Sequence, residues 1–315
     1  MMVETKCALC GSDNSEHYLT SSDRLSDSDS NQYNIVKCAE CGFLYTNPRP
    51  VDHEKHSAPF IESGDAFNIL AEPKSISDRI FRIFHPASVR WKRRAIDNLP
   101  TIGRLLDFGC RTGDFLFAMK TAKWEVQGIE ADKLGMDYAV SHYGLDVVSS
   151  LEELVENNNE KYDVITMWHT LDKVPDLPST LESLKLLLED DGYLLIGLPN
   201  IQSYDAQKYK SDWIGLDLPR HLYHFDRAHL TKLAENHGFS VSSYRNIPWD
   251  TLHNVFMSAL KRANKHRWNA RWSINWPLLI WTLMMSWLLG GKWFSFGQRC
   301  ASSGVLYYLR REKKS

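Results

Sequence analysis

Two acidic residues, Asp107 and Glu130, flank a glycine-rich loop in the first half of the chain. The apolar run Leu105–Phe108 predicts a strand that ends in the loop Gly109–Gly113. Apolar residues at helical spacing follow the loop, and a second apolar run, Trp124–Ile129, ends at Glu130. This order of strand, glycine loop, helix, strand and acid is typical of a nucleotide-binding unit in a parallel sheet.

The chemistry of this unit indicates a ligand that contains a ribose. Glycine at a strand end lets backbone N–H groups approach a ligand, and the following helix N-terminus favours a negative group. A carboxylate at the position of Glu130 accepts hydrogen bonds from ribose hydroxyls. The glycine spacing, Asp107-x-Gly109-x-x-x-Gly113, differs from the GxGxxG of dinucleotide-binding proteins, and Asp107 suits an ammonium group better than a pyrophosphate. We therefore predict S-adenosylmethionine, with a dinucleotide-dependent oxidoreductase and an ordinary glycine turn as the alternatives.

The segment LDFGCRTGDFL, residues 106–116, resembles the LDxGCGTGxFL motif of the class I S-adenosylmethionine-dependent methyltransferases. The nearest group is that of bacterial methyltransferases with an N-terminal zinc-knuckle module, and the resemblance covers most of residues 1–245 and the final strand. It implies an α/β, Rossmann-like sheet, and the apolar run of residues 276–291 adds a C-terminal apolar helical insertion. It assigns cofactor binding to Asp107, Gly109, Cys110, Gly113, Glu130, Ser150 and Trp168. Arg111 stands where the family has a glycine, so a side chain must tolerate the backbone angles of the loop.

Four cysteines form two CxxCG pairs, Cys7 with Cys10 and Cys38 with Cys41. Each pair places two thiolates on one side of a turn, and two pairs together provide the tetrahedral sulfur set that zinc prefers. Because four cysteines leave no open coordination position, we predict a structural zinc and not a catalytic one. A nucleic-acid-binding ribbon is the alternative, and the lack of a dense basic patch disfavours it.

Three histidines are candidates for a proton acceptor. His169 follows the apolar run Tyr162–Trp168, and ligands bind at the carboxyl ends of strands in open α/β sheets. His221 and His224 lie in the stretch GLDLPRHLYHF, residues 215–225. A histidine is the usual proton acceptor when a hydroxyl or an acidic carbon is methylated, and resemblance to related sugar methyltransferases makes His221 the matching base. The alternative for each is a structural histidine that braces its loop.

The chain departs from its relatives after His169. Relatives usually have WHxLEHVPD, whereas this chain has Asp172-Lys173 in place of the Glu-His pair. This departure and Arg111 support an alternative function, a catalytically degenerate methyltransferase fold that acts as a membrane-associated binding or assembly protein.

Residues 261–291 combine basic, aromatic and apolar side chains. The basic and aromatic stretch 261–272 precedes the apolar run Trp276–Gly291, which is shorter than the roughly 20 residues of a spanning helix and contains Pro277. This order is typical of an element that lies on a membrane surface. A buried helix or hairpin and an apolar dimer face are the alternatives, and the sequence does not specify the oligomeric state.

The overall composition is that of an ordinary globular protein, with 43% hydrophobic and 24% charged residues. A net charge of −2 gives no reason to expect a nucleic acid partner. The first residues lack the apolar region of a signal peptide, and the cysteine pairs fit a reducing compartment. We expect a cytoplasmic protein, peripheral to the inner face of the cytoplasmic membrane if residues 261–291 contact lipid.

The predicted organisation has five segments. They are the zinc-knuckle module 1–50, a helical connector 51–90, the cofactor-binding domain 91–249, the insertion 250–297 and a final strand in 298–315. Predicted helices are Ile76–Phe84, 91–99, Lys133–Tyr143, Leu151–Asn157, Leu177–Leu188 and Arg227–His237, the fifth of which ends at the stop signal Asp190-Asp191-Gly192. Further predicted strands are Val147–Ser149, Tyr162–Trp168, Tyr193–Leu198, Phe294–Phe296 and Gly304–Leu309, the last two completing the sheet as an antiparallel edge hairpin. The predicted function is methyl transfer from S-adenosylmethionine to an oxygen or carbon of a small or amphiphilic acceptor, such as a saccharide or a lipid-linked saccharide.

Overall fold

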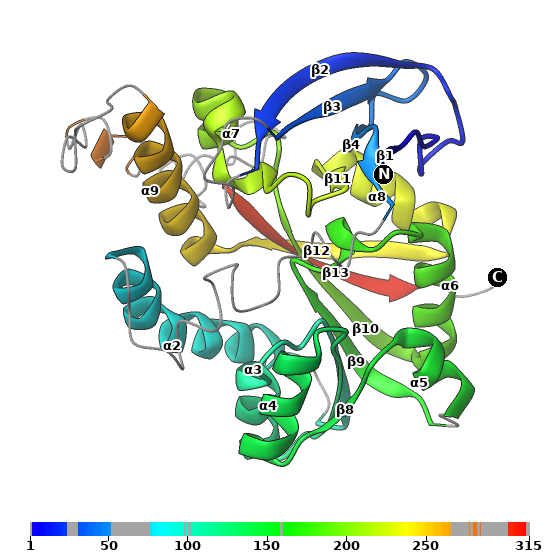
Figure 1. The fold of residues 1–315 in the computed structure, drawn as a ribbon. Coiled ribbons are helices and arrows are strands. Elements are labelled where there is room, and N and C mark those ends of the chain that lie inside the picture. The colour runs from blue at the N-terminus through cyan, green and yellow to red at the C-terminus, as the bar shows by residue number, and fades with distance from the viewer. Residues whose placement is uncertain are drawn as a thin grey trace.

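The computed structural model describes residues 2–23, 31–51, 76–97, 99, 102–157, 160–265 and 302–312, together with Pro277, Ile280, Trp281 and Met284. The strands form a two-stranded, a four-stranded and a seven-stranded sheet (Figure 1). The two small sheets contain the N-terminal strands, and the large sheet forms the centre of the molecule.

The central sheet has the strand order β12-β13-β10-β9-β6-β7-β8. Its strands are β6 (Arg104–Phe108), β7 (Glu125–Ile129), β8 (Asp146–Val148), β9 (Tyr162–Trp168), β10 (Leu188–Pro199), β12 (Phe239–Asn246) and β13 (Gly304–Arg311). The pairs from β8 to β10 are parallel, whereas β13 is antiparallel to both β10 and β12. The chain starts this sheet at β6, builds outward to β8 and then returns to place β9 on the other side of β6. Ligands bind at such a reversal, outside the carboxyl ends of the strands.

Helices cover both faces of this sheet, which explains the continuous apolar runs of its inner strands. Leu105 of β6 packs in the core under α2 (Ile76–Ile96), α3 (Asp114–Thr121) and α4 (Lys133–Tyr143). The next residue, Leu106, points to the other face, under α5 (Leu151–Asn157), α6 (Leu177–Leu187) and α8 (Arg227–Asn236). Figure 1 shows α3 and α4 on one side of the strands and α5 and α6 on the other. The result is the predicted α/β, Rossmann-like architecture.

The N-terminal module is joined to the rest of the fold by a shared sheet. β1 (Met2–Val3) pairs with β5 (Arg49–Pro50), and β2 (Ser15–Ser22), β3 (Gln32–Cys38) and β4 (Leu44–Thr46) form an antiparallel sheet. A fourth strand, β11 (Tyr223–His224), pairs with β4 and comes from the segment that follows β10. The boundary predicted near residue 50 is therefore bridged by main-chain hydrogen bonds.

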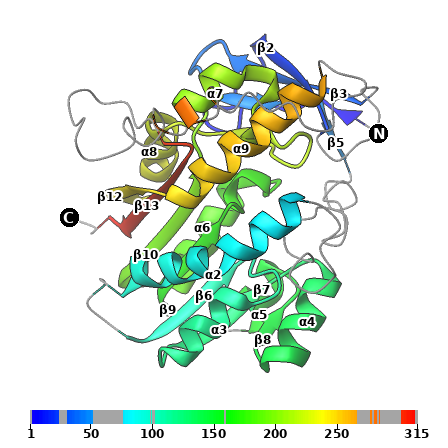
Figure 2. The same cartoon turned by 90° about the vertical axis from the view of Figure 1, so that its left-hand side faces the viewer.

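A third layer lies beside the module. It consists of α7 (Tyr204–Tyr209), the short 3₁₀ helices η3 (Lys210–Asp212) and η4 (Ile214–Leu216), and α9 (Pro248–Lys265). Trp213, Tyr209 and Val255 are buried together where α9 crosses these short helices. Figure 2 shows α9 running beside α7, close to the N-terminal strands. Among the described residues, no helix has the length and apolar character needed to cross a membrane.

Three local predictions differ from the structure. α2 is one helix that runs through Pro86, where the sequence predicted two. An interior proline costs roughly 3 kcal/mol, and the core packing of Trp91, Ala95 and Ile96 offsets this cost. β10 runs through Asp190-Asp191-Gly192, and a register shift against β9 between Leu188 and Tyr193 absorbs the extra residues.

The third difference concerns the sheet edge. β13 is an inner strand, because β12 pairs along its outer side. The predicted strand Phe294–Phe296 lies outside the described residues. The antiparallel partners of β13 are therefore β10 and β12, and β12 precedes the insertion in the chain.

Candidate functional site

The glycine loop lies where the predicted unit places it, between the end of β6 and the start of α3. Gly109 has φ 81° and Gly113 has φ 80°, backbone angles that side chains disfavour. A Cβ at Gly109 would also lie 2.4 Å from the Thr170 Oγ1, so the loop passes close to the chain that leaves β9. Glycine is required at position 109 for both reasons.

Arg111 occupies the loop position where relatives have glycine, and its backbone adopts the left-handed conformation, with φ 55°. A side chain in this conformation costs roughly 1–2 kcal/mol. Its backbone N–H donates a hydrogen bond of 2.7 Å to Glu130 Oε2, which holds the loop in this shape. The substitution for glycine is thus accommodated without loss of the loop.

Glu130 is fixed by the main chain on both of its oxygens. Oε2 accepts from the Arg111 N–H at 2.7 Å, and Oε1 accepts from the Asp132 N–H at 2.9 Å. Burial raises the pKa of Glu130 above its usual range. Because a carboxylate oxygen can accept two hydrogen bonds, each oxygen can still accept one from a ribose hydroxyl.

Asp107 and Lys92 place opposite charges next to the loop. Asp107 is buried at the end of β6 and accepts a hydrogen bond of 2.6 Å from the Thr166 hydroxyl. Burial raises the pKa of Asp107 to about 6. The Lys92 ammonium of α2 lies 4.8 Å from the centre of the Trp168 ring. Burial lowers the pKa of Lys92 to about 8, although the negative charge of Asp107 opposes this change.

These residues fit S-adenosylmethionine as the predicted ligand. An anionic and a cationic side chain suit the ammonium and carboxylate of an amino acid, and Glu130 suits a ribose. When bound, this cofactor supplies a methyl group on a sulfonium, which is already activated for transfer. Lys92 was not recognised in the sequence, because a lysine in an amphipathic helix usually faces solvent.

Three other predicted cofactor residues have mainly structural contacts. The Cys110 thiol packs against β7, where a Cβ at Gly128 would lie 2.6 Å from its Sγ. The Ser150 Oγ accepts the Glu153 N–H at 3.2 Å and caps α5. The Trp168 ring packs in the core, although its buried Nε1 has no hydrogen-bond partner among the described residues. Their roles in cofactor binding remain predictions.

Two of the three predicted histidines are buried beneath the N-terminal module. His221 Nδ1 lies 3.1 Å from the Gly215 carbonyl oxygen, and Nε2 lies 3.4 Å from Asp172 Oδ2. Burial lowers the pKa of His221. His224 Nε2 lies 3.3 Å from Thr46 Oγ1 on β4, and burial lowers the pKa of His224 to about 3. Both side chains are therefore neutral and shielded from solvent.

His169 has a different environment, at the carboxyl end of β9. Its side chain is 27% exposed, and Nε2 lies 3.0 Å from Oδ2 of Asp250 in α9. Its backbone N–H donates to the Gly197 carbonyl oxygen of β10 at 2.9 Å. The His169 ring is therefore partly exposed to solvent, whereas the rings of His221 and His224 are buried.

The four cysteines of the N-terminal module converge as predicted. The Sγ atoms of Cys7, Cys10, Cys38 and Cys41 all lie within 4.8 Å of one another. Cys7 and Cys41 are 3.6 Å apart, and Cys10 and Cys38 are 3.5 Å apart. Tetrahedral zinc with bonds of about 2.3 Å places its sulfurs about 3.8 Å apart, so this cluster fits zinc.

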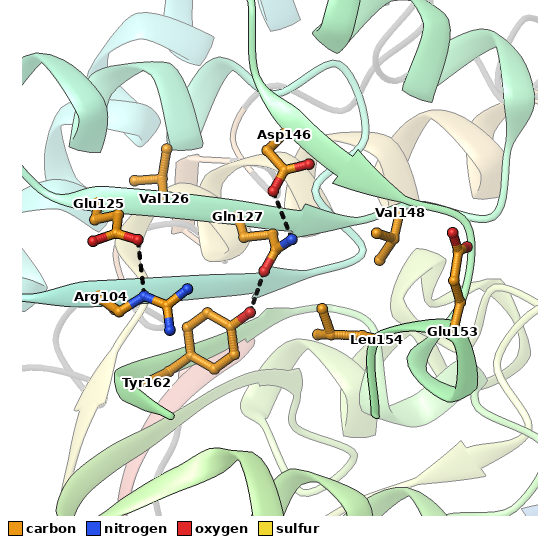
Figure 3. A pocket seen from close by; sticks show the side chains of 9 residues that line it. All are labelled: Arg104, Glu125, Val126, Gln127, Asp146, Val148, Glu153, Leu154 and Tyr162. Atoms are coloured by element: carbon orange, nitrogen blue, oxygen red, sulfur yellow. Dashed lines mark hydrogen bonds and ion pairs between the residues drawn. The ribbon is translucent and has the colours of Figure 1, made fainter. Parts of the chain in front are cut away.

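A cavity of about 160 Å³ lies at the opposite ends of the strands. Figure 3 shows Gln127 between Asp146, to which it donates at 2.6 Å, and the Tyr162 hydroxyl. Arg104 donates to Glu125 at 2.9 Å in the same wall. Since Arg104 and Tyr162 begin β6 and β9, the cavity lies away from the glycine loop. It is not the cofactor site.

A family model described as a methyltransferase domain matches residues 80–244, slightly more than half of the chain. The ubiquinone biosynthesis O-methyltransferase of Actinobacillus pleuropneumoniae serotype 7 (strain AP76) is 31% identical over 136 residues, which are 39% of this chain and 58% of that protein. The ubiquinone biosynthesis O-methyltransferase of Bordetella avium (strain 197N) is 25% identical over 207 residues, 61% of this chain and 86% of that protein. This chain thus spans less than two thirds of the first relative's length.

Among solved structures, the magnesium protoporphyrin IX methyltransferase of Synechocystis PCC 6803 with bound SAM is 15% identical to this chain. The superposition covers 62% of this chain and 90% of that protein, with a TM-score of 0.44.

The buried Asp107 makes stability depend on pH. The folded carboxyl keeps its proton up to about pH 6, whereas the unfolded one loses it near pH 3.9. Unfolding therefore releases a proton within this window, and the wild-type protein loses stability as the pH rises through it. We expect Asp107→Asn to gain on the order of 3 kcal/mol relative to wild type between pH 4 and pH 7.

Urea unfolding of both proteins across this pH range measures the difference. The control is Asp137→Asn, which removes an exposed carboxylate paired with Lys133 on α4. The control should follow wild type at every pH. A constant difference between Asp107→Asn and wild type would show that the carboxyl is ionised throughout.

Proposed function

Because the chain belongs to the family of methyltransferase domains, we propose that it transfers a methyl group from S-adenosylmethionine to an oxygen of an amphiphilic acceptor. The observation that supports this most strongly is the arrangement of Glu130, the glycine loop and the Asp107–Lys92 charges at one edge of the sheet. It provides partners for the ribose, the ammonium and the carboxylate of the cofactor. The O-methyltransferase names of the relatives favour an oxygen over a carbon.

The chemical step requires little activation by the protein. The acceptor oxygen must lie in line with the methyl group, so positioning supplies most of the rate, and a side chain must take the hydroxyl proton. We place this proton acceptor at His169. His221, the base implied by resemblance, has neighbours on both ring nitrogens and is only 6% exposed.

The first experiment is calorimetric titration of the purified chain with S-adenosylmethionine and S-adenosylhomocysteine. We expect micromolar binding, and at least a hundredfold weaker binding for Glu130→Ala, because the ribose loses a carboxylate that accepts charge-assisted hydrogen bonds. Glu182→Ala, on the exposed face of α6, is the matched control and should bind as wild type does.

Formation of S-adenosylhomocysteine is then measured with catechol and with a lipid-linked sugar as acceptors. No cofactor binding by folded wild-type protein would contradict the enzyme proposal. It would favour the alternative, a degenerate fold that acts as a membrane-associated binding or assembly protein.

An amphiphilic acceptor is supported by an apolar surface beside α7. Ile280, Trp281 and Met284 are 61%, 44% and 48% exposed and lie on one face of a helical turn. The Lys208 ammonium lies 4.2 Å from the centre of the Trp281 ring. Lys261 and Arg262 hydrogen-bond within the protein, to Ser211 and to Asp212 respectively. Together with the basic residues in the sequence 265–271, the apolar residues suit contact with an anionic membrane surface. We therefore propose that the protein acts at the membrane, on an acceptor such as a lipid-linked saccharide.

Sedimentation with vesicles that contain anionic or only neutral lipids tests this contact. We expect binding to anionic vesicles, and at least tenfold weaker binding for Trp281→Glu, because a charged group replaces a large apolar one. Leu186→Glu places the same charge at an apolar residue of α6 that is 67% exposed and should not change binding. If Trp281→Glu instead dissociates a dimer and leaves vesicle binding unchanged, the surface joins two copies of the chain.

We also propose that the four-cysteine cluster binds one structural zinc ion. Metal analysis should find about one zinc per chain in wild type and almost none in Cys10→Ser, because three thiolates hold the ion much more weakly than four. Cys110→Ser, which changes a buried cysteine outside the cluster, should retain the zinc. Full zinc occupancy in Cys10→Ser would contradict the assignment.

A further inference from the structure

We propose that Asp250 and His169 form a proton-accepting pair, in which Asp250 orients the imidazole and His169 Nδ1 takes the proton of the acceptor hydroxyl. This inference rests on the proposed methyl transfer. The two residues are far apart in sequence, yet His169 Nε2 and Asp250 Oδ2 lie 3.0 Å apart. Their side chains are 27% and 18% exposed, so the pair is shielded but still open on one side.

His169 has a strained backbone conformation, which contacts with neighbouring residues must stabilise. Its φ of 54° is left-handed, which costs a residue with a side chain of order 1–3 kcal/mol and is enriched at functional sites. The His169 N–H bonds to the Gly197 carbonyl oxygen on β10, and the next residue, Thr170, packs against Gly109. The backbone at His169 is therefore held next to a residue that contacts the glycine loop.

Asp250 is held from the opposite side by the start of β13. Its neighbour Thr251 has its Oγ1 3.0 Å from the Ser302 Oγ, and the same Oγ1 accepts the Ser303 N–H at 3.2 Å. A Cβ at Gly304 would lie 2.0 Å from Asp250 Oδ2, so the absence of a side chain there leaves room for the carboxylate. The start of α9 next to Asp250 is thus anchored independently of His169.

The charge of Asp250 also acts on the cofactor site. It is one of the negative charges that favour the protonated form of Lys92, together with those of Asp107 and Asp114. Lys92 therefore lies within electrostatic reach of both Asp250 and Asp107. The His169–Asp250 pair consequently lies in the neighbourhood of Lys92.

The pairing decides which ring nitrogen can act as a base. Asp250 Oδ2 has no hydrogen-bond partner among the described residues, so it is available to a proton on His169 Nε2, 3.0 Å away. A neutral imidazole that is protonated on Nε2 has its lone pair on Nδ1. As the acceptor oxygen forms its bond to the methyl carbon, the carbon–sulfur bond breaks and its electron pair stays on sulfur. The hydroxyl proton passes to Nδ1, and the carboxylate of Asp250 stabilises the resulting imidazolium. The proton then leaves to solvent.

This pair was not apparent from the sequence or from the family match. His169 is within the matched residues 80–244, whereas Asp250 lies after them, at the start of α9. An alternative role for Asp250 is direct binding of the cofactor ammonium. If Asp250 orients His169, loss of the carboxylate changes the protonated nitrogen of the imidazole. If Asp250 binds the ammonium, the same loss weakens cofactor binding.

Nitrogen-15 NMR of the full zinc-loaded chain, labelled at histidine, tests the pair without any turnover. The His169 signal is assigned from its absence in His169→Gln. We expect wild type to carry the proton on Nε2, and Asp250→Asn to show a mixture of the two neutral forms, since an amide can both donate and accept. Asp137→Asn, on the exposed face of α4, should leave the signal unchanged.

Kinetics with S-adenosylmethionine and catechol provide the second readout. We expect kcat to fall about a hundredfold in His169→Gln and about tenfold in Asp250→Asn, with KM for the cofactor within twofold of wild type. A proton on Nδ1, an unchanged signal in Asp250→Asn or an undiminished kcat in His169→Gln would overturn the pair. Weakened cofactor binding in Asp250→Asn would assign the carboxylate to the ammonium instead. Failure of the proposed function gives a different result. Wild type would then bind no cofactor, although His169 would still carry its proton on Nε2.

Discussion

The hydrogen bond from the Arg111 backbone to Glu130 is the contact on which the candidate site depends. It joins the glycine loop after β6 to the acid that follows β7, so two parallel strands present their ligand-binding groups at one edge. The same bond holds Arg111 in a left-handed conformation that its side chain disfavours. The buried Asp107 and the partly buried Lys92 can then lie beside the loop as opposite charges, which suit the polar groups of a ligand.

The N-terminal module closes the other side of this region. β11 pairs with β4, and Arg220 donates both to Asp217 in its own loop and to Asp23 of the module. This docking buries His221 and His224, which explains why residue types suited to proton transfer are held neutral and away from solvent. A zinc ion bound to the four cysteines would stabilise the module that covers them, and so act on the site through the fold.

Much of the fold and part of the site could be predicted from local patterns. The helix Lys133–Tyr143 and the strand Tyr162–Trp168 have the predicted bounds, because apolar spacing and the neighbouring helix caps are local signals. Pro86 and the Asp190-Asp191-Gly192 stretch gave misleading signals, because packing and a register shift override a local preference for a break. The position of β13 inside the sheet also has no local signal, because pairing order depends on the whole topology.

The sequence by itself determined the glycine loop, Glu130 and the two cysteine pairs, because their chemistry depends on residue type and short spacing. Only the tertiary structure decided that Lys92 faces Asp107, that His169 pairs with Asp250 and that His221 and His224 are enclosed. Each of these contacts joins segments that are distant in sequence. α2 and α9 meet the carboxyl ends of the strands, and the N-terminal module meets β11. Contacts between such segments follow from topology and packing, which leave no pattern in the residues on either side.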